Sequence, residues 1–271
     1  MHLSVEILHH VFSYLVSHRE TLIACSKDPA LFPIVERHLY HHVIVNLGPI
    51  PADREPDYAF EPKRLSELVS KKPYIKHYVR ILQIQVNEFE QSDLPREDLL
   101  GKAAKHLLMF PALECITLTV SEGVAEVWFF SSAFIAVLKD RLNLPTIKEL
   151  HLNGSNDFPL SILDSCKNIK YLTLTGEVGG EGQFCDSALP RLKSLALDTH
   201  YISSSILAWV KLGIREIHSL KCASLSVKIL PELLGVCSET LKRLEIDLRY
   251  SPCEVSNFES PLIVKLKRIR F

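Results

Sequence analysis

Histidine and cysteine side chains are the residues of this sequence best suited to bind a metal ion or to carry out acid–base chemistry. Several histidines lie near the start of the chain, but His9 and His10 are adjacent and diverge on a helix. His38 and His42 form the only i, i+4 pair among them, and a lone pair of this kind usually faces solvent. A metal site needs convergent ligands, usually with cysteine or carboxylate support. We therefore expect no metal site and no cofactor.

The seven cysteines indicate reduced thiols rather than a disulfide or zinc framework. Their number is odd, no two have the C-x-x-C spacing, and most lie in apolar stretches. This usage is typical of a cytosolic or nuclear protein, so we expect a cytoplasmic or nuclear location. The cysteines are Cys25, Cys115, Cys166, Cys185, Cys222, Cys237 and Cys253.

The sequence contains none of the motifs that mark common catalytic sites. It has no G-x-S-x-G elbow, P-loop, H-E-x-x-H helix or EF-hand loop. The glycine cluster GEVGGEG at 176–182 lacks the G-x-G-x-x-G spacing and places two acids where a phosphate would bind. His151, Asp198 and a serine can be grouped as a triad, but without the nucleophile elbow that would support one. We therefore expect a protein that is not an enzyme.

Charge and hydropathy argue against nucleic-acid and membrane partners. The chain has 31 Lys and Arg against 32 Asp and Glu, and its formal net charge of -1 lacks the basic excess that phosphate contacts usually need. The longest apolar run, VWFFSSAFIAVL, covers the 12 residues 127–138. It is too short to span a bilayer, so we expect a buried helix there.

The pattern apolar-x-x-apolar-x-apolar recurs along most of the chain. The first positions of successive occurrences are 34, 34, 22, 23, 22, 27 and 25 residues apart, and the last five spacings fall in or near the leucine-rich-repeat range. Eight occurrences at quasi-regular spacing favour repeats stacked into a solenoid. The occurrences are Val79-Leu82-Ile84, Leu113-Ile116-Leu118, Ile147-Leu150-Leu152, Ile169-Leu172-Leu174, Leu192-Leu195-Leu197, Ile214-Ile217-Ser219, Leu241-Leu244-Ile246 and Leu266-Ile269-Phe271.

The spacing within each repeat predicts a strand. The last two apolar residues are two apart, so they face the same side of a strand, and stacked strands share one core. Apolar residues at helix spacing lie between the strands, for example Leu230, Leu233 and Leu234. The alternation predicts an α/β fold with parallel strands, right-handed crossovers and a sheet on the concave face. A doubly wound α/β sheet is the alternative, and the missing glycine-rich phosphate turn argues against it.

The start of the chain is predicted to form short helices at 3–16, 21–25 and 31–42, with Ser4 capping the first. The segment 46–63 is rich in proline and charge, which predicts an exposed linker or loop. The chain therefore divides into three parts. These are a helical module at 1–45, a linker and joining helix at 46–72, and a solenoid of about eight irregular repeats at 73–271.

The helical module resembles an F-box, especially as found in fungal F-box/leucine-rich-repeat proteins. The resemblance rests on LSVEILHHVFSYL, TLIACS and RHLYHHVIV, and SELVSKKPYIKHYVRILQI is similar to the segment joining F-box to repeats. Ser4 stands where the family usually has proline, and CSKDPALF lacks the usual tryptophan. The resemblance covers the whole chain. It implies an N-terminal F-box-like helical module followed by a right-handed leucine-rich-repeat solenoid with parallel strands on the concave face.

The function that this resemblance implies is substrate recognition in a Skp–cullin–F-box ubiquitin ligase. The module would bind the Skp-type adaptor, which links it to the cullin ligase, and the repeats would bind an unknown protein substrate. The alternative is a leucine-rich-repeat interaction scaffold unconnected to ubiquitin ligase. The expected adaptor-binding residues are Leu3, Val5, Ile7, Leu8, Val11, Phe12, Leu15 and Leu22.

Two rows of polar residues follow from the repeat register. The concave face is the default ligand surface of a solenoid. Its expected substrate-binding residues are Thr117, Thr119, His151, Asn153, Thr173, Thr175, Asp198, His218, Glu245 and Asp247. A mostly basic row follows the first apolar position of each repeat, and we interpret it as a solvated flank. That row is Arg80, Glu114, Lys148, Lys170, Lys193, Arg215, Lys242 and Lys267.

Overall fold

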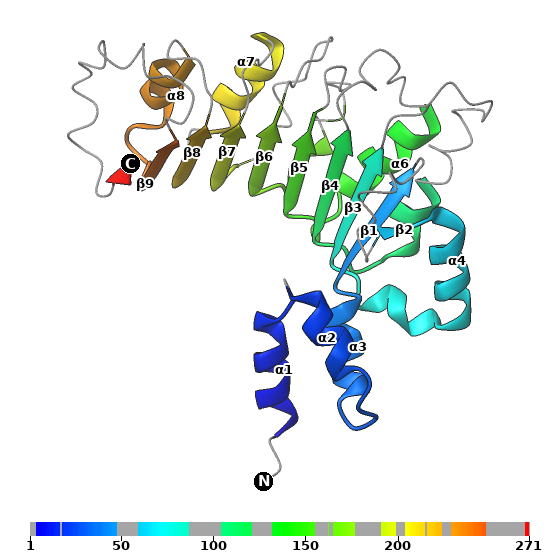
Figure 1. The fold of residues 1–271 in the computed structure, drawn as a ribbon. Helices are drawn as coiled ribbons and strands as arrows, with labels where there is room; N and C mark the ends of the chain where they lie inside the picture. The colour runs from blue at the N-terminus through cyan, green and yellow to red at the C-terminus, as the bar shows by residue number, and fades with distance from the viewer. Residues whose placement is uncertain are drawn as a thin grey trace.

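The fold is α/β, with one parallel sheet and helices packed on it (Figure 1). It was obtained as a computed structural model. The sheet order is β10-β9-β8-β7-β6-β5-β4-β3-β1-β2, and every pairing is parallel. The structure describes residues 4–16, 18–47, 59–86, 104–120, 132–154, 162, 165–176, 191–198, 204–214, 216–223, 229–247 and 269–270.

From β3 onward each strand pairs with the next strand in the sequence, whereas β1 lies between β2 and β3. Apolar and polar residues alternate along the strands, so one face of the sheet is buried and the other carries polar side chains. The strands are β1 (His42–Leu47), β2 (Ala59–Phe60), β3 (Ile81–Val86), β4 (Cys115–Val120), β5 (Glu149–Asn153), β6 (Tyr171–Thr175), β7 (Ser194–Asp198), β8 (Ser219–Ala223), β9 (Arg243–Asp247) and β10 (Ile269–Arg270).

The helices after β1 share one core with the buried face of the sheet, as the helical spacing of their apolar residues predicts. Phe134 and Leu138 enter this core from α6, and Trp209 enters it from α7. Residues 104–109 are also helical. The helices are α1 (Val5–Tyr14), α2 (Arg19–Cys25), α3 (Phe32–Leu39), α4 (Pro62–Lys71), the 3-10 helix η2 (Pro73–His77), α6 (Ser132–Leu142), α7 (Ser204–Gly213) and α8 (Ile229–Cys237).

The apolar run at 127–138 is predicted to be a buried helix, and its described part begins α6. Phe134 and Leu138 are 1% and 0% exposed, while 127–131 lie outside the described residues. Within the described ranges, no helix combines the length and the hydropathy needed to cross a bilayer.

The predicted repeat Ile214-Ile217-Ser219 is wrong in register. Strand β8 aligns Leu220 with Leu244 and Cys222 with Ile246, so the repeat is Ile217-Leu220-Cys222. All three of these side chains are buried. With this correction, the first positions 147, 169, 192, 217 and 241 are spaced by 22 to 25 residues. The sequence pattern was misassigned because a cysteine fills the last core position.

The sheet begins earlier than predicted. The third helix ends at Leu39, and His42 is the first residue of β1. The predicted boundary at residue 45 therefore falls inside a strand, and the proposed linker starts with two strand residues, Asn46 and Leu47. The physical reason is the alternation at HVIV, where Val43 and Val45 point into the core. The joining helix is observed as α4.

Two glycines end neighbouring strands in a backbone conformation that disfavours other residues. Gly154 has φ +70° and Gly176 has φ +74°. Their N–H groups donate to the carbonyl oxygens of Thr175 and Asp198 over 2.8 Å, which extends the ladder past β5 and β6. A Cβ on Gly154 would lie 2.5 Å from the Val120 carbonyl oxygen.

We expect Gly154→Ala to lower the free energy of unfolding by about 1–3 kcal/mol, because it adds left-handed backbone strain and a contact with a backbone atom. The matched control is Gly235→Ala in α8, where an added Cβ meets no atom within 4 Å. That change is expected to raise the free energy by up to about 1 kcal/mol. Urea unfolding followed by circular dichroism measures both; equal effects from the two substitutions would contradict the role given to Gly154.

Candidate functional site

Helices α1, α2 and α3 form a small core of their own, separate from the core of the sheet. Phe12, Leu22 and Val35 are its buried residues, at 4%, 1% and 0% exposure. Ser4 caps α1 as predicted, since its hydroxyl oxygen accepts a 3.4 Å hydrogen bond from the Ile7 N–H. Figure 1 shows these three helices next to the β1 end of the sheet.

An exposed apolar stripe runs along α1 on the side away from this small core. Ile7, Val11 and Tyr14 are 49%, 45% and 70% exposed. Their spacing of four and three residues places them on one helix face. Val5 and Ile23 are also exposed, at 53% and 40%. Exposed apolar residues gathered on one helix face mark an interaction surface more strongly than scattered ones do.

The predicted adaptor-binding residues divide into two groups in the structure. Val5, Ile7 and Val11 are exposed and available to a partner. Phe12 and Leu22 are buried, which corrects their assignment as contact residues because they hold the module together. The half-buried Leu8 and Leu15 pack against the same core, and Leu3 lies outside the described residues. Sequence reasoning missed Tyr14, although its spacing from Val11 was a usable signal.

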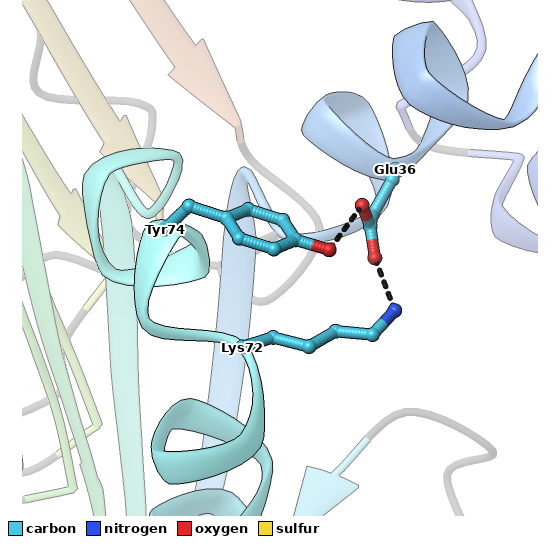
Figure 2. A network of polar contacts seen from close by, with 3 residues as sticks. All are labelled: Glu36, Lys72 and Tyr74. Atoms are coloured by element: carbon cyan, nitrogen blue, oxygen red, sulfur yellow. Dashed lines mark hydrogen bonds and ion pairs between the residues drawn. The ribbon is translucent and has the colours of Figure 1, made fainter.

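A polar network joins this module to the chain that enters the sheet (Figure 2). Glu36 of α3 is only 4% exposed. One of its carboxylate oxygens accepts a hydrogen bond from Lys72 Nζ at 2.6 Å, and the other accepts one from the Tyr74 hydroxyl at 3.0 Å. The hydrogen bond to Glu36 raises the pKa of Lys72. Lys72 Nζ also lies 5.1 Å from the centre of the Phe32 ring. Both carboxylate oxygens are thus paired, as burial of a charge requires.

The histidines near the start of the chain do not form the predicted solvent-facing pair. His42 belongs to β1, and His38 Nε2 lies 3.1 Å from His9 Nδ1, within hydrogen-bonding distance. Desolvation by burial lowers the pKa of His38, His41 and His42, which favours their neutral forms. These side chains therefore belong to the packed junction between α1, α3 and β1.

The polar face of the sheet brings most of the predicted substrate-binding residues into two rows. Thr117, His151 and Thr173 are register partners in one row, and Thr119, Asn153, Thr175 and Asp198 are partners in the next. Asn153 Nδ2 donates to Thr119 Oγ1 over 3.2 Å. These rows give the face fixed spacings in two directions, which suits binding of an extended partner.

Three other predicted face residues have different surroundings. Glu245 accepts from Arg243 at 3.0 Å and pairs with Lys221 at 3.3 Å, and the hydrogen bond from Lys221 holds its pKa below the usual value. His218 lies just before β8, off the polar face, because the repeat register differs from the predicted one. Asp247 is the last residue of β9. The predicted triad partners His151 and Asp198 stand on strands β5 and β7, which are not neighbours.

The mostly basic row also changes by one member, because His218 takes the place predicted for Arg215. Its residues extend the backbone ladder ahead of the strands: the Lys170 N–H donates to the Lys148 carbonyl oxygen, and the Lys193 N–H donates to that of Lys170, both over 2.8 Å. Arg80 and Glu114 pair over 3.5 Å. Its interpretation as a solvated flank stays a prediction.

Five cysteines fall among the described residues, and all five are free thiols. Cys115, Cys166, Cys222 and Cys237 are buried, as the apolar surroundings predict, and Cys25 is half-buried. Burial raises the pKa of Cys222 to about 12 and that of Cys237 to about 11, so these thiols stay protonated. Cys185 and Cys253 lie outside the described residues.

Comparison with known proteins gives no relative: no protein-family model, no curated protein and no solved structure matches the chain. Function is therefore inferred from the contacts, exposure and charge of the chain's own residues.

We expect Glu36→Ala to lower the free energy of unfolding by about 1–3 kcal/mol, because Lys72 and Tyr74 lose their shared acceptor. The matched control is Glu67→Ala on α4, a carboxylate that is exposed to solvent. We expect the control to stay within about 0.5 kcal/mol of the wild type. Urea unfolding measures both changes, and a neutral Glu36→Ala would contradict the anchoring role of the network.

Stability is expected to fall as the pH drops below the usual histidine pKa of 6.5. The pKa values of His38, His41 and His42 are lowered in the folded state, so the unfolded chain takes up protons first. Their contribution is fully present above about pH 6.5 and is lost as the pH falls through the lowered values. Urea midpoints between pH 7.5 and 5.5 measure this loss. His38→Gln should reduce the slope and His10→Gln, on the exposed side of α1, should not; equal slopes would contradict the assignment.

Proposed function

We propose that this chain is the substrate-recognition subunit of a Skp–cullin–F-box ubiquitin ligase. In this proposal α1–α3 form an F-box-like module that binds a Skp-type adaptor. The strands and the helices that follow form a right-handed leucine-rich-repeat solenoid that binds a protein substrate. The observation that carries the proposal is the exposed apolar stripe of Ile7, Val11 and Tyr14 beside a separate helical core.

The stripe supports adaptor binding through its chemistry. Burial of a valine, isoleucine or comparable side chain stabilises a complex by roughly 1.5–3 kcal/mol. Three such side chains on one helix face fit the mode in which an amphipathic helix lies in an apolar groove. Phe12 and Leu22 contribute indirectly, because their packing holds α1 against α2 and α3. The core and the contact face of α1 are therefore different sets of residues.

The repeat assignment is supported by the sheet order and the spacing of core residues. Consecutive strands from β3 to β10 are direct neighbours, which is how stacked repeats pair. The corrected first positions recur every 22 to 25 residues between 147 and 241, within the leucine-rich-repeat range. Substrate binding is assigned to the polar face, whose rows include Thr117, His151 and Asn153.

Such a subunit would act by position and not by chemistry. It raises the effective concentration of a substrate lysine near an activated ubiquitin, and this requires a fixed geometry between module and sheet. The Glu36 network supplies such a connection, since it joins α3 to Lys72 and Tyr74 at the entrance to the sheet. The proposal places the protein in the cytoplasm or nucleus, where cullin ligases work.

Binding of the purified chain to a purified Skp-type adaptor tests the proposal. The double variant Ile7→Asp, Val11→Asp is expected to weaken the adaptor complex by about 100-fold or more, because each charge would be buried without a partner. Both side chains are exposed in the free protein, so the variant is expected to fold. Isothermal titration calorimetry measures the affinity, and circular dichroism checks the fold.

The matched control is Val236→Asp, which changes an exposed apolar residue on α8, far along the sheet from the module. It should bind the adaptor as the wild type does. Failure of the folded wild type to bind would reject the ligase role and favour the interaction scaffold. Equal weakening by both variants would mean that the stripe is not the contact surface.

A further inference from the structure

Three side chains of different metal-binding types meet on the polar face of β4 and β5. Cys115 and Glu149 are register partners on these adjacent strands, and His151 is two residues beyond Glu149 on the same face. The Cys115 Sγ atom, a ring nitrogen of His151 and a carboxylate oxygen of Glu149 all lie within 4.8 Å of one another. Sequence analysis could not group them, because Cys115 and Glu149 are far apart in the chain.

The distances within this cluster fit a shared ion better than direct bonds. His151 Nε2 and Glu149 Oε2 are 3.7 Å apart, which is too long for a hydrogen bond. Ligands of a tetrahedral zinc ion, bound at about 2.0–2.3 Å, stand roughly 3.3–3.7 Å from one another. Small side-chain rotations bring the third ligand, Cys115 Sγ, to the same separation.

The electrostatics of the cluster also favour a cation. Burial, and then the nearby Glu149 carboxylate, raise the pKa of Cys115 to about 11, so without a cation the thiol stays protonated. A divalent ion reverses this balance, since a coordinated thiol loses its proton. One thiolate, one carboxylate and a neutral imidazole together would neutralise a charge of +2.

We propose that Cys115, Glu149 and His151 form a binding site for a zinc ion. A thiolate and an imidazole select zinc over Mg²⁺ and Ca²⁺, which take oxygen ligands. The Glu149 and His151 side chains are 44% and 30% exposed, so a fourth position opens to solvent. Three protein ligands with an open position bind water or a group from a partner. The inference is independent of adaptor binding.

The backbone supports the site through its rigidity. Each ligand stands on a strand whose neighbours on both sides are in register, β3 and β5 for Cys115 and β4 and β6 for the other two. Sites built on strands hold their ligands more exactly in place than sites on loops. Zinc binding should therefore need only side-chain movement, with little change in the fold.

Zinc titration of the whole chain, stripped of metal and kept reduced with a phosphine, tests the inference. Competition with a chromophoric chelator is expected to show a site that takes one zinc equivalent and resists a large excess of Mg²⁺. Cobalt substitution should give the charge-transfer absorption of a thiolate ligand. Cys115→Ser should remove that absorption, and Glu149→Gln and His151→Asn should each weaken zinc binding by at least about tenfold.

Two matched controls locate the site. Cys25→Ser changes a half-buried thiol on α2, and His9→Gln removes one of the two histidines that meet at the N-terminal junction. Both should retain zinc binding and the cobalt absorption. Because Glu149 is on the surface, Glu149→Gln is expected to fold, and zinc should raise the melting temperature of the wild type more than that of this variant. Absence of zinc binding by the folded wild type, or binding lost in His9→Gln and kept in Cys115→Ser, would overturn the inference.

Discussion

Each strand of the sheet buries its alternate leucines and isoleucines only because another strand in register lies beside it and helices cover the buried face. Leu150 and Leu172 illustrate this, since they are register partners in β5 and β6 and both are essentially unexposed. The same register fixes the polar face, where Thr117, His151 and Thr173 must then stand in a row. Both proposed binding regions of the sheet depend on that alignment, and so does the placement of Cys115 beside Glu149.

The strands were largely predictable from sequence, because the pattern of three apolar residues has a direct physical meaning in a buried parallel sheet. The prediction failed at β8, where the core position of Cys222 looked like a break in the pattern. It also missed β1, whose valines were assigned to a helix because the preceding residues have helical spacing. In both cases the neighbouring strand decides the structure, and a single segment does not contain that information.

The candidate surfaces were only partly predictable. The amphipathic pattern of α1 was visible, but Phe12 and Val11 are adjacent apolar residues with opposite roles, one buried and one exposed. Only the packing of α2 and α3 against α1 separates them. The Glu36 network and the contact between His9 and His38 join residues 36 and 29 positions apart, or more. No local pattern encodes such pairings.

The sequential order of the strands also bears on how the protein folds and evolves. Between β3 and β10 every strand pairs with its neighbour in the chain, so most contacts join segments that are close in sequence, which favours rapid folding. No strand is threaded between distant ones in this part of the sheet. A unit can be gained or lost by duplication without changing the topology of the others. The two ends of the array, each with one neighbour fewer, are then the places where fraying begins.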